Sequence, residues 1–211
     1  MGLCNKIIRT VPHVVRARCT LAWLAIGAGF TGELSGRVGD YVSAAEACGR
    51  ETIAQRMAEY AGDGVPEDLA RRVASLHLLA PGLDIVRIAQ EAKTPVPDVA
   101  RTYFAVGDRF GFDWLRGAAA GVGASDNHWQ RMAVAAIVED LYGHQKDLTL
   151  RVIESGNGAP AGNGAIDAWV DQRGAAVHRM EALFADIRQA GVIDLPMLAV
   201  ANRQLRSLVS G

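Results

Sequence analysis

The chain has 211 residues, of which 50% are hydrophobic and 21% charged, the proportions of an ordinary globular protein. At this length, folding hides roughly 70% of the surface of the unfolded chain, enough for one or two cores without a metal or disulfide. The formal net charge is −1 and no long run of like charges occurs, which excludes nucleic acid as the main partner.

The cysteine content indicates a reducing compartment. Cys4, Cys19 and Cys48 form neither an even disulfide set nor a CxxC pair. The apolar segment 19–30 is too short to span a bilayer, and it contains a Trp and lacks the small-residue cleavage site of a secretory signal. We therefore expect a cytoplasmic protein without a membrane partner.

Helical periodicity dominates the sequence, whereas the alternation typical of strands is hard to find. This pattern predicts an all-α fold, a multi-helix bundle with no parallel sheet. Residues 1–64 are assigned only loosely to N-terminal helices, and residues 65–211 to the bundle. Interruptions at 62–66 and 93–97 predict shorter helices at about 67–80, 83–92 and 98–109.

The strongest predicted element is a long central helix over about 126–154. At 1.5 Å per residue its length is about 44 Å, which suits the central strut of a bundle. Ser125 or Asp126 is the expected N-cap, and Trp114 and Trp129 are expected to be buried. The apolar residues at helical spacing are Trp129, Met132, Ala133, Ala136, Ile137, Leu141, Leu148 and Val152.

The segment 155–164, SGNGAPAGNG, is rich in Gly, Asn and Pro and predicts a flexible loop. Beyond it, helical spacing returns at 166–189 and at 195–209. We expect these two terminal helices to fold back onto the long helix. The apolar residues of the last one are Leu198, Ala201, Leu205 and Leu208.

Residues 27–32, GAGFTG, match the GxGxxG pattern of dinucleotide-binding proteins. That fingerprint requires a preceding strand, a helix that opens at the last glycines, and an acidic residue after a second strand about 20 residues later. Residues 21–26 instead contain two alanines and a Trp, and residues 41–60 have a helical pattern. We interpret the motif as a glycine-rich helix end or kink, and an independent NAD-binding enzyme as the less favoured alternative.

Residues 85–110 imitate a helix-turn-helix, with two short helices around a break at 93–96. The second helix would have to contact bases, yet Arg101 and Arg109 are its only basic side chains. The composition favours packing over DNA binding. The core-type residues of this helix are Val99, Ala100, Tyr103, Phe104 and Val106.

Asp140 and His144 lie one turn apart on the long helix and could begin a metal site. The histidines are scattered singly and Glu-x-x-His repeats are absent, so a helix-surface pair is favoured. An amino-acid dehydrogenase typically needs a lysine with a lowered pKa. Lys6, Lys93 and Lys146 lie near the terminus, in a predicted turn and on a charged helix face. We therefore predict no catalytic, cofactor-binding or metal-binding residue.

Three stretches carry a resemblance to a known family. They are residues 103–116 (YFAVGDRFGFDWLR), 128–131 (HWQR) and 140–149 (DLYGHQKDLT), and residues 194–208 (DLPMLAVANRQLRSL) add a fourth. In order and spacing, they resemble the C-terminal helical region of the large bacterial NAD-specific glutamate dehydrogenases. The resemblance is good from about residue 65 onward.

The resemblance implies a parent enzyme that oxidatively deaminates L-glutamate to 2-oxoglutarate with reduction of NAD. Its catalytic region would lie upstream of these helices, in a homo-oligomer. None of that family's glutamate-binding or nicotinamide-binding motifs has a matching position here. The chain is therefore expected to be a non-catalytic C-terminal domain, without a cofactor of its own, that binds the catalytic region or its subunits and serves assembly or regulation. A free-standing helical interaction module is the alternative.

Overall fold

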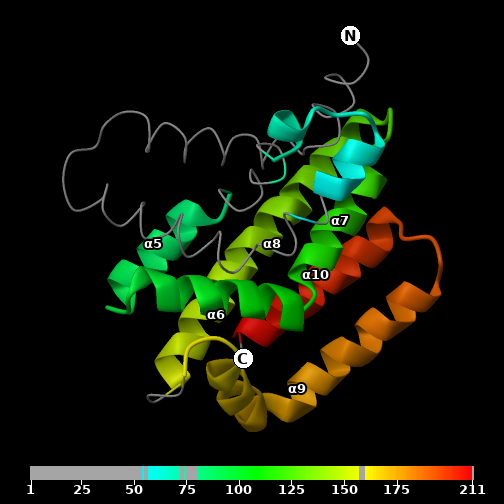
Figure 1. Cartoon of the computed structure of the whole chain (residues 1–211). Coiled ribbons are helices and arrows are strands. Elements are labelled where there is room, and N and C mark those ends of the chain that lie inside the picture. The colour runs from blue at the N-terminus through cyan, green and yellow to red at the C-terminus, as the bar shows by residue number, and fades with distance from the viewer. Residues whose placement is uncertain (1–53, 55–56, 72–73, 75–79, 157–159, 211) are drawn as a thin grey trace. The chain divides into compact units, whose positions relative to one another are not determined.

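The computed structural model describes residues 54, 57–71, 74, 80–156 and 160–210 (Figure 1). Within these ranges the chain forms helices, turns and bends but no strand, which confirms the all-α prediction. The chain divides into two compact units, Met1–Arg101 and Thr102–Gly211. The domain division expected at residues 64 and 65 stays a prediction.

The described part of the first unit consists of short helices. Residues 57–62 and 67–71 are helical, and α5 (Gly82–Glu91) and the start of α6 (Val96–Arg109) follow. Gly64, with φ of 79°, adopts the left-handed conformation between the first two segments, which glycine accepts without strain. The bounds of α5 and α6 agree to within two residues with the predicted 83–92 and 98–109. The helix predicted at about 67–80 lies partly outside the described residues, and its end stays a prediction.

Lys93 ends α5 in the turn that the sequence predicts. Its φ is 52°, in the left-handed region. The N–H of Thr94 donates to the carbonyl of Ala89 at 3.1 Å and thereby closes the helix end. Lys93 therefore has a structural role in the turn between α5 and α6.

The second unit contains a four-helix bundle of α7 (Phe112–Gly123), α8 (His128–Ser155), α9 (Asn163–Gln189) and α10 (Leu195–Ser210). Consecutive helices run in opposite directions, so that α10 is parallel to α8 (Figure 1). Helix α8 packs against α7, α9 and α10, and α10 also packs against α7 and α9. The interior is mostly apolar and includes Leu115, Val138, Leu141, Leu148, Val152, Trp169, Val177, Met180, Phe184, Leu198, Ala201 and Leu205.

Helix α8 confirms the long central helix, but its N-cap is Asn127, so the prediction of Ser125 or Asp126 is wrong. The Oδ1 atom of Asn127 accepts hydrogen bonds from the backbone N–H groups of Trp129 and Gln130, at 2.9 and 3.2 Å. Ser125 Oγ instead accepts from the N–H of Asn127 at 3.1 Å. Three adjacent polar residues can each cap a helix, and spacing alone does not show where the backbone turns.

The prediction that Trp129 is buried is also wrong, because its side chain is 76% exposed. Met132 is 56% exposed. The buried face of α8 begins at Val134 and continues through Val138 and Leu141. Apolar residues cover so much of the circumference of the first turns that the periodicity fits two faces, and only the positions of α7 and α10 select one.

The predicted break between the two long helices is confirmed, since α8 ends at Ser155 and α9 begins at Asn163. Gly162, with φ of 87°, precedes α9, and its N–H donates to Thr102 Oγ1 at 3.0 Å. Helix α9 bends at Arg173, whose φ is −129°.

Among the described residues, no helix combines the length and apolar character needed to cross a membrane.

Candidate functional site

Two of the stretches that carry the family resemblance, 103–116 and 140–149, meet at a hydrogen bond between α6 and α8. The side chain of Gln145 is fully buried, and its Nε2 donates to the carbonyl of Tyr103 at 2.9 Å, across 42 residues of sequence. Thr149 Oγ1 donates to the carbonyl of Gln145 at 2.7 Å. Gly107 leaves room for this contact, because a Cβ atom there would lie 2.8 Å from Gln145 Nε2.

A nearly buried arginine lies at the adjacent contact between α7 and α8. Arg116 Nη2 donates to Asp113 Oδ1 at 2.6 Å, and the guanidinium carbon lies 4.6 Å from the ring centroid of Tyr142. Burial lowers the pKa of Arg116, but the interactions with Asp113, Tyr103 and Tyr142 together outweigh it and the net pKa is raised. The cation therefore stays charged. Its ion pair with Asp113 lies within α7, and its cation–π contact with Tyr142 joins α7 to α8.

Asp108 is the second carboxylate near this contact. Partial burial, and then repulsion from Asp113, raise the pKa of Asp108 above its ordinary value. Asp113 is already paired with Arg116.

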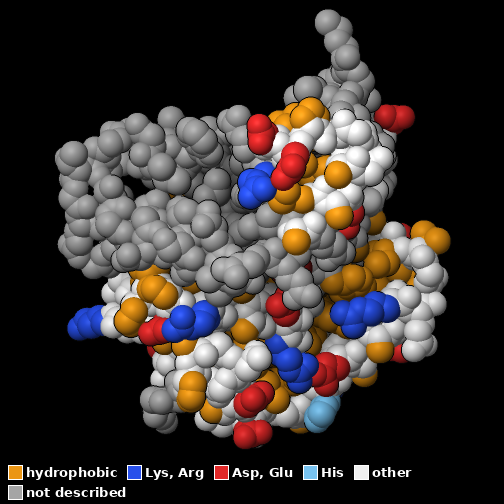
Figure 2. Space-filling model, in the orientation of Figure 1, with side chains coloured by type: hydrophobic (Ala, Val, Ile, Leu, Met, Phe, Trp, Pro, Cys, Tyr) orange, Lys and Arg blue, Asp and Glu red, His pale blue; other side chains and the backbone are white. Residues whose placement is uncertain are grey.

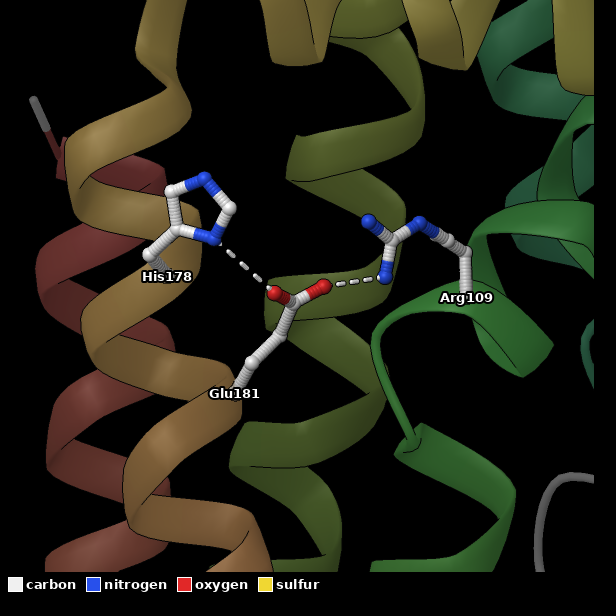
Figure 3. A network of polar contacts seen from close by, with 3 residues as sticks. All are labelled: Arg109, His178 and Glu181. Carbon is white, nitrogen blue, oxygen red and sulfur yellow. Dashed lines mark hydrogen bonds and ion pairs between the residues drawn. The ribbon is translucent and has the colours of Figure 1, made fainter.

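Figure 3 shows a second polar network, between the end of α6 and α9. Arg109 Nη1 donates to Glu181 Oε1 at 2.5 Å, and His178 Nδ1 lies 3.3 Å from Glu181 Oε2. The hydrogen bond from Arg109 is the main cause that lowers the pKa of Glu181. Because His178 is 81% exposed and Arg109 and Glu181 are partly exposed, solvent screens the network and it adds little stability.

An aromatic contact lies beside this network. The guanidinium carbon of Arg188 is 4.3 Å from the centroid of Trp114, whose ring centroid is 5.6 Å from that of Phe184. Trp114 is therefore half-buried rather than part of the interior. Gly111, with φ of 69°, turns the chain between α6 and α7, and a Cβ atom there would lie 3.4 Å from Arg188 Nη2.

Asp140 and His144 lie at the contact between α8 and α10, so the interpretation as a helix-surface pair is wrong. Asn202 Nδ2 donates to Asp140 Oδ2 at 2.8 Å. Burial lowers the pKa of His144, and the charge of Arg206 acts in the same direction against Asp140 and Asp147. The sequence interpretation failed because the residues that contact this pair come from α10, which is distant in sequence.

The other candidate residues do not come together at one site. Lys146 Nζ lies 3.3 Å from Asp147 Oδ1 on a partly exposed face, as the sequence predicts. The second helix of the apparent helix-turn-helix buries Val99, Ala100, Tyr103 and Val106, and Phe104 is half-buried. In the part of the chain that the structure covers, no group of three or more potential metal ligands occurs. The glycine motif at 27–32, Lys6 and the three cysteines lie outside the described residues.

The sequence did not single out Arg116, Gln145 or Asn202 as contact residues. Gln145 meets a carbonyl 42 residues away, and Asn202 meets a carboxylate 62 residues away. Helical spacing gives no information about such distant pairs. The glycine at position 107 inside a helix was the only local signal of a close approach between helices.

Comparisons with known proteins agree with the resemblance. Residues 30–207 match the family described as glutamate dehydrogenase, C-terminal. The NAD-specific glutamate dehydrogenase of Mycobacterium tuberculosis is 36% identical over 156 residues, and that of Pseudomonas aeruginosa is 32% identical over 159 residues. These alignments cover 74% and 75% of this chain but 10% of each relative. The chain thus spans about a tenth of the length of the relatives that it matches.

Proposed function

The chain belongs to the glutamate dehydrogenase C-terminal family, and from this premise we propose that it is a non-catalytic helical domain that binds the catalytic region of such an enzyme. Its role is assembly or regulation. The reaction of the complex is the oxidative deamination of L-glutamate to 2-oxoglutarate with reduction of NAD. The chain itself carries no cofactor, and the complex is a cytoplasmic homo-oligomer.

One observation carries this proposal: polar side chains of the stretches that resemble the dehydrogenases serve contacts between helices. Gln145 binds the backbone of α6, Asp140 binds α10, and Arg109 binds α9. A catalytic set needs its groups to converge on one position where a reacting atom can sit. These groups instead join different pairs of helices, which supports a structural role for the resemblance.

The proposal is tested by purifying the tagged chain alone and from its native cells. Alone, the chain should not reduce NAD in the presence of glutamate, as followed by the absorbance of NADH. From cells, it should co-purify with a polypeptide that peptide mass spectrometry identifies as a glutamate dehydrogenase catalytic region. The captured complex should reduce NAD when glutamate is added.

Two outcomes would contradict the proposal. A glutamate-dependent rate of the isolated chain, above that of a heat-killed control, would make it an enzyme in its own right. Capture of other proteins with no dehydrogenase polypeptide among them would favour a free-standing interaction module.

A further inference from the structure

The first two turns of α8 present an unpartnered apolar face. Trp129, Met132, Ala133 and Ala136 are spaced three and four residues apart and therefore share one side of the helix. Trp129, Met132 and Ala136 are exposed and Ala133 is half-buried. We call these four residues the Trp129 stripe.

The bundle does not use this stripe for its own packing. The interior side of α8 is formed by Val134, Val138 and Leu141. Leaving a Trp and a Met in water forgoes about 25 cal/mol for each Å² of apolar surface that burial would hide. Trp is also among the residues that contribute most to binding at protein interfaces. The stripe therefore has the composition of a binding surface and no role within the bundle.

The stripe is held in place by the loop that precedes it. Arg131 Nη1 donates to the carbonyls of Ser125 and Asp126, at 3.0 and 2.8 Å. Gln130 Nε2 donates to the carbonyl of Val122 at 3.0 Å, and Asn127 caps the helix. Because the start of α8 is already ordered, this chain loses little backbone entropy there when a partner covers the stripe.

We propose that the Trp129 stripe is the surface by which this chain docks on the catalytic region of the dehydrogenase, an inference that rests on the proposed function. In the relatives, the segment that matches this chain makes up 10% of a much longer polypeptide. Interfaces between domains of such chains are often only about 600–1,500 Å². The area that a partner would bury on a stripe centred on one Trp and one Met lies in the lower part of that range.

A second copy of this chain fits the stripe less well. An aromatic side chain buries about 150–250 Å², so two stripes that face each other would bury on the order of 800 Å² in total. Stable dimers between free proteins usually bury roughly 1,200–2,000 Å². The area therefore favours a large partner that surrounds the Trp over a symmetric pair.

A second exposed apolar area provides a matched control. Figure 2 shows hydrophobic side chains gathered over the α9–α10 connection and the first half of α10. Val200, in the first half of α10, is 51% exposed, close to the 56% of Met132. The substitutions Trp129→Ser, Met132→Ser and Val200→Ser each remove one exposed apolar side chain, and the first two affect only the stripe.

The experiment compares capture of the dehydrogenase polypeptide from native cells by the wild-type chain and the three variants. Helix content and melting temperature are first measured to establish that each variant folds. Quantitative mass spectrometry then gives the amount of the polypeptide recovered per tagged chain. We expect at least about a tenfold loss with Trp129→Ser, a smaller loss with Met132→Ser and full recovery with Val200→Ser.

The outcomes separate this inference from the function on which it rests. If the wild-type chain captures no dehydrogenase polypeptide, both are wrong. If Trp129→Ser captures as much as wild type, or if Val200→Ser alone loses capture, the function stands and the stripe assignment is wrong. Sedimentation of the purified chain covers the remaining case: a dimer that Trp129→Ser dissociates would assign the stripe to a second copy and overturn the proposal.

Discussion

At the scale of single residues, the same residue type plays opposite roles at different positions. Gly107 and Gly143 both lie inside helices, where glycine costs about 0.5–1 kcal/mol relative to alanine. A Cβ atom at Gly107 would lie 2.8 Å from Gln145 Nε2, whereas one at Gly143 would meet nothing within 4 Å. Only the first glycine is required by a close approach between helices.

Gly107→Ala should destabilise the protein, because the new methyl group displaces the amide of Gln145 from the carbonyl of Tyr103. Loss of a buried hydrogen bond costs about 1–3 kcal/mol, which exceeds the gain in helix propensity. Gly143→Ala should instead stabilise by about 0.5–1 kcal/mol. Urea unfolding followed by circular dichroism measures both. Equal stabilisation by the two substitutions would show that Gln145 has no fixed position.

Tryptophan gives a second contrast. Trp169 is 1% exposed, and its ring centroid lies 5.7 Å from that of Phe110, whereas Trp129 is 76% exposed. Trp169→Ala should cost about 3–5 kcal/mol, and Trp129→Ala no more than about 0.5 kcal/mol. Thermal melting distinguishes them. A large loss of stability in Trp129→Ala would mean that its ring is covered by another part of the chain.

At the scale of elements, helix bounds were predictable because they are encoded locally. Gly64, Pro97 and Gly162 stop or start helices by their own backbone preferences, and the predicted bounds agree with α5, α6, α9 and α10 to within a few residues. Helix α7 was not predicted, because its second half, GAAAGVG, consists mostly of small residues and of glycine, which is unfavourable inside a helix. The buried face of α8 and the partners of Asp140 were not predictable, because both depend on helices distant in sequence.

The contact between α8 and α10 should weaken in acid. Burial holds the pKa of His144 below its ordinary value of 6.5, so the unfolded chain binds a proton at higher pH than the folded chain. The stability that neutral His144 contributes is complete above pH 6.5 and declines as the pH falls from there toward the folded pKa.

His144→Gln should therefore flatten the dependence of stability on pH below about pH 6.5. His128→Gln is the control, because His128 lies exposed at the start of the same helix. Urea midpoints at several pH values give the comparison, and hydrogen exchange of α10 locates the effect. A wild-type slope that His144→Gln leaves unchanged would assign the acid sensitivity to other groups.

At the scale of the described bundle, α9 and α10 cover the long helix that precedes them. Both pack against α8, and they bury Trp169, Val177 and Leu205. The Gly- and Pro-rich connection between α8 and α9 is the expected site of first cleavage by a protease. After a single cut there, the two fragments should elute together in size-exclusion chromatography, because buried apolar area holds them together.

Leu205→Asp supplies the control for that experiment, since a charge at a fully buried position should let the fragments separate. Mass spectrometry of the eluted fractions identifies the fragments. If the wild-type fragments separate, α9 and α10 are held on α8 mainly by the covalent connection. In that case the apolar faces of both helices would be available to another polypeptide.

The position of α10 also governs the order in which the bundle is completed during translation. Helix α10 contacts α7, α8 and α9, and its Asn202 meets Asp140 across 62 residues. The ribosome therefore releases α7, α8 and α9 before the residues that close their shared interior have been made. During that interval the surface around Leu141 faces water, and apolar surface of this kind is what chaperones bind and what drives aggregation. A stalled ribosome upstream of residue 195 would expose a nascent chain that cannot bury its own core.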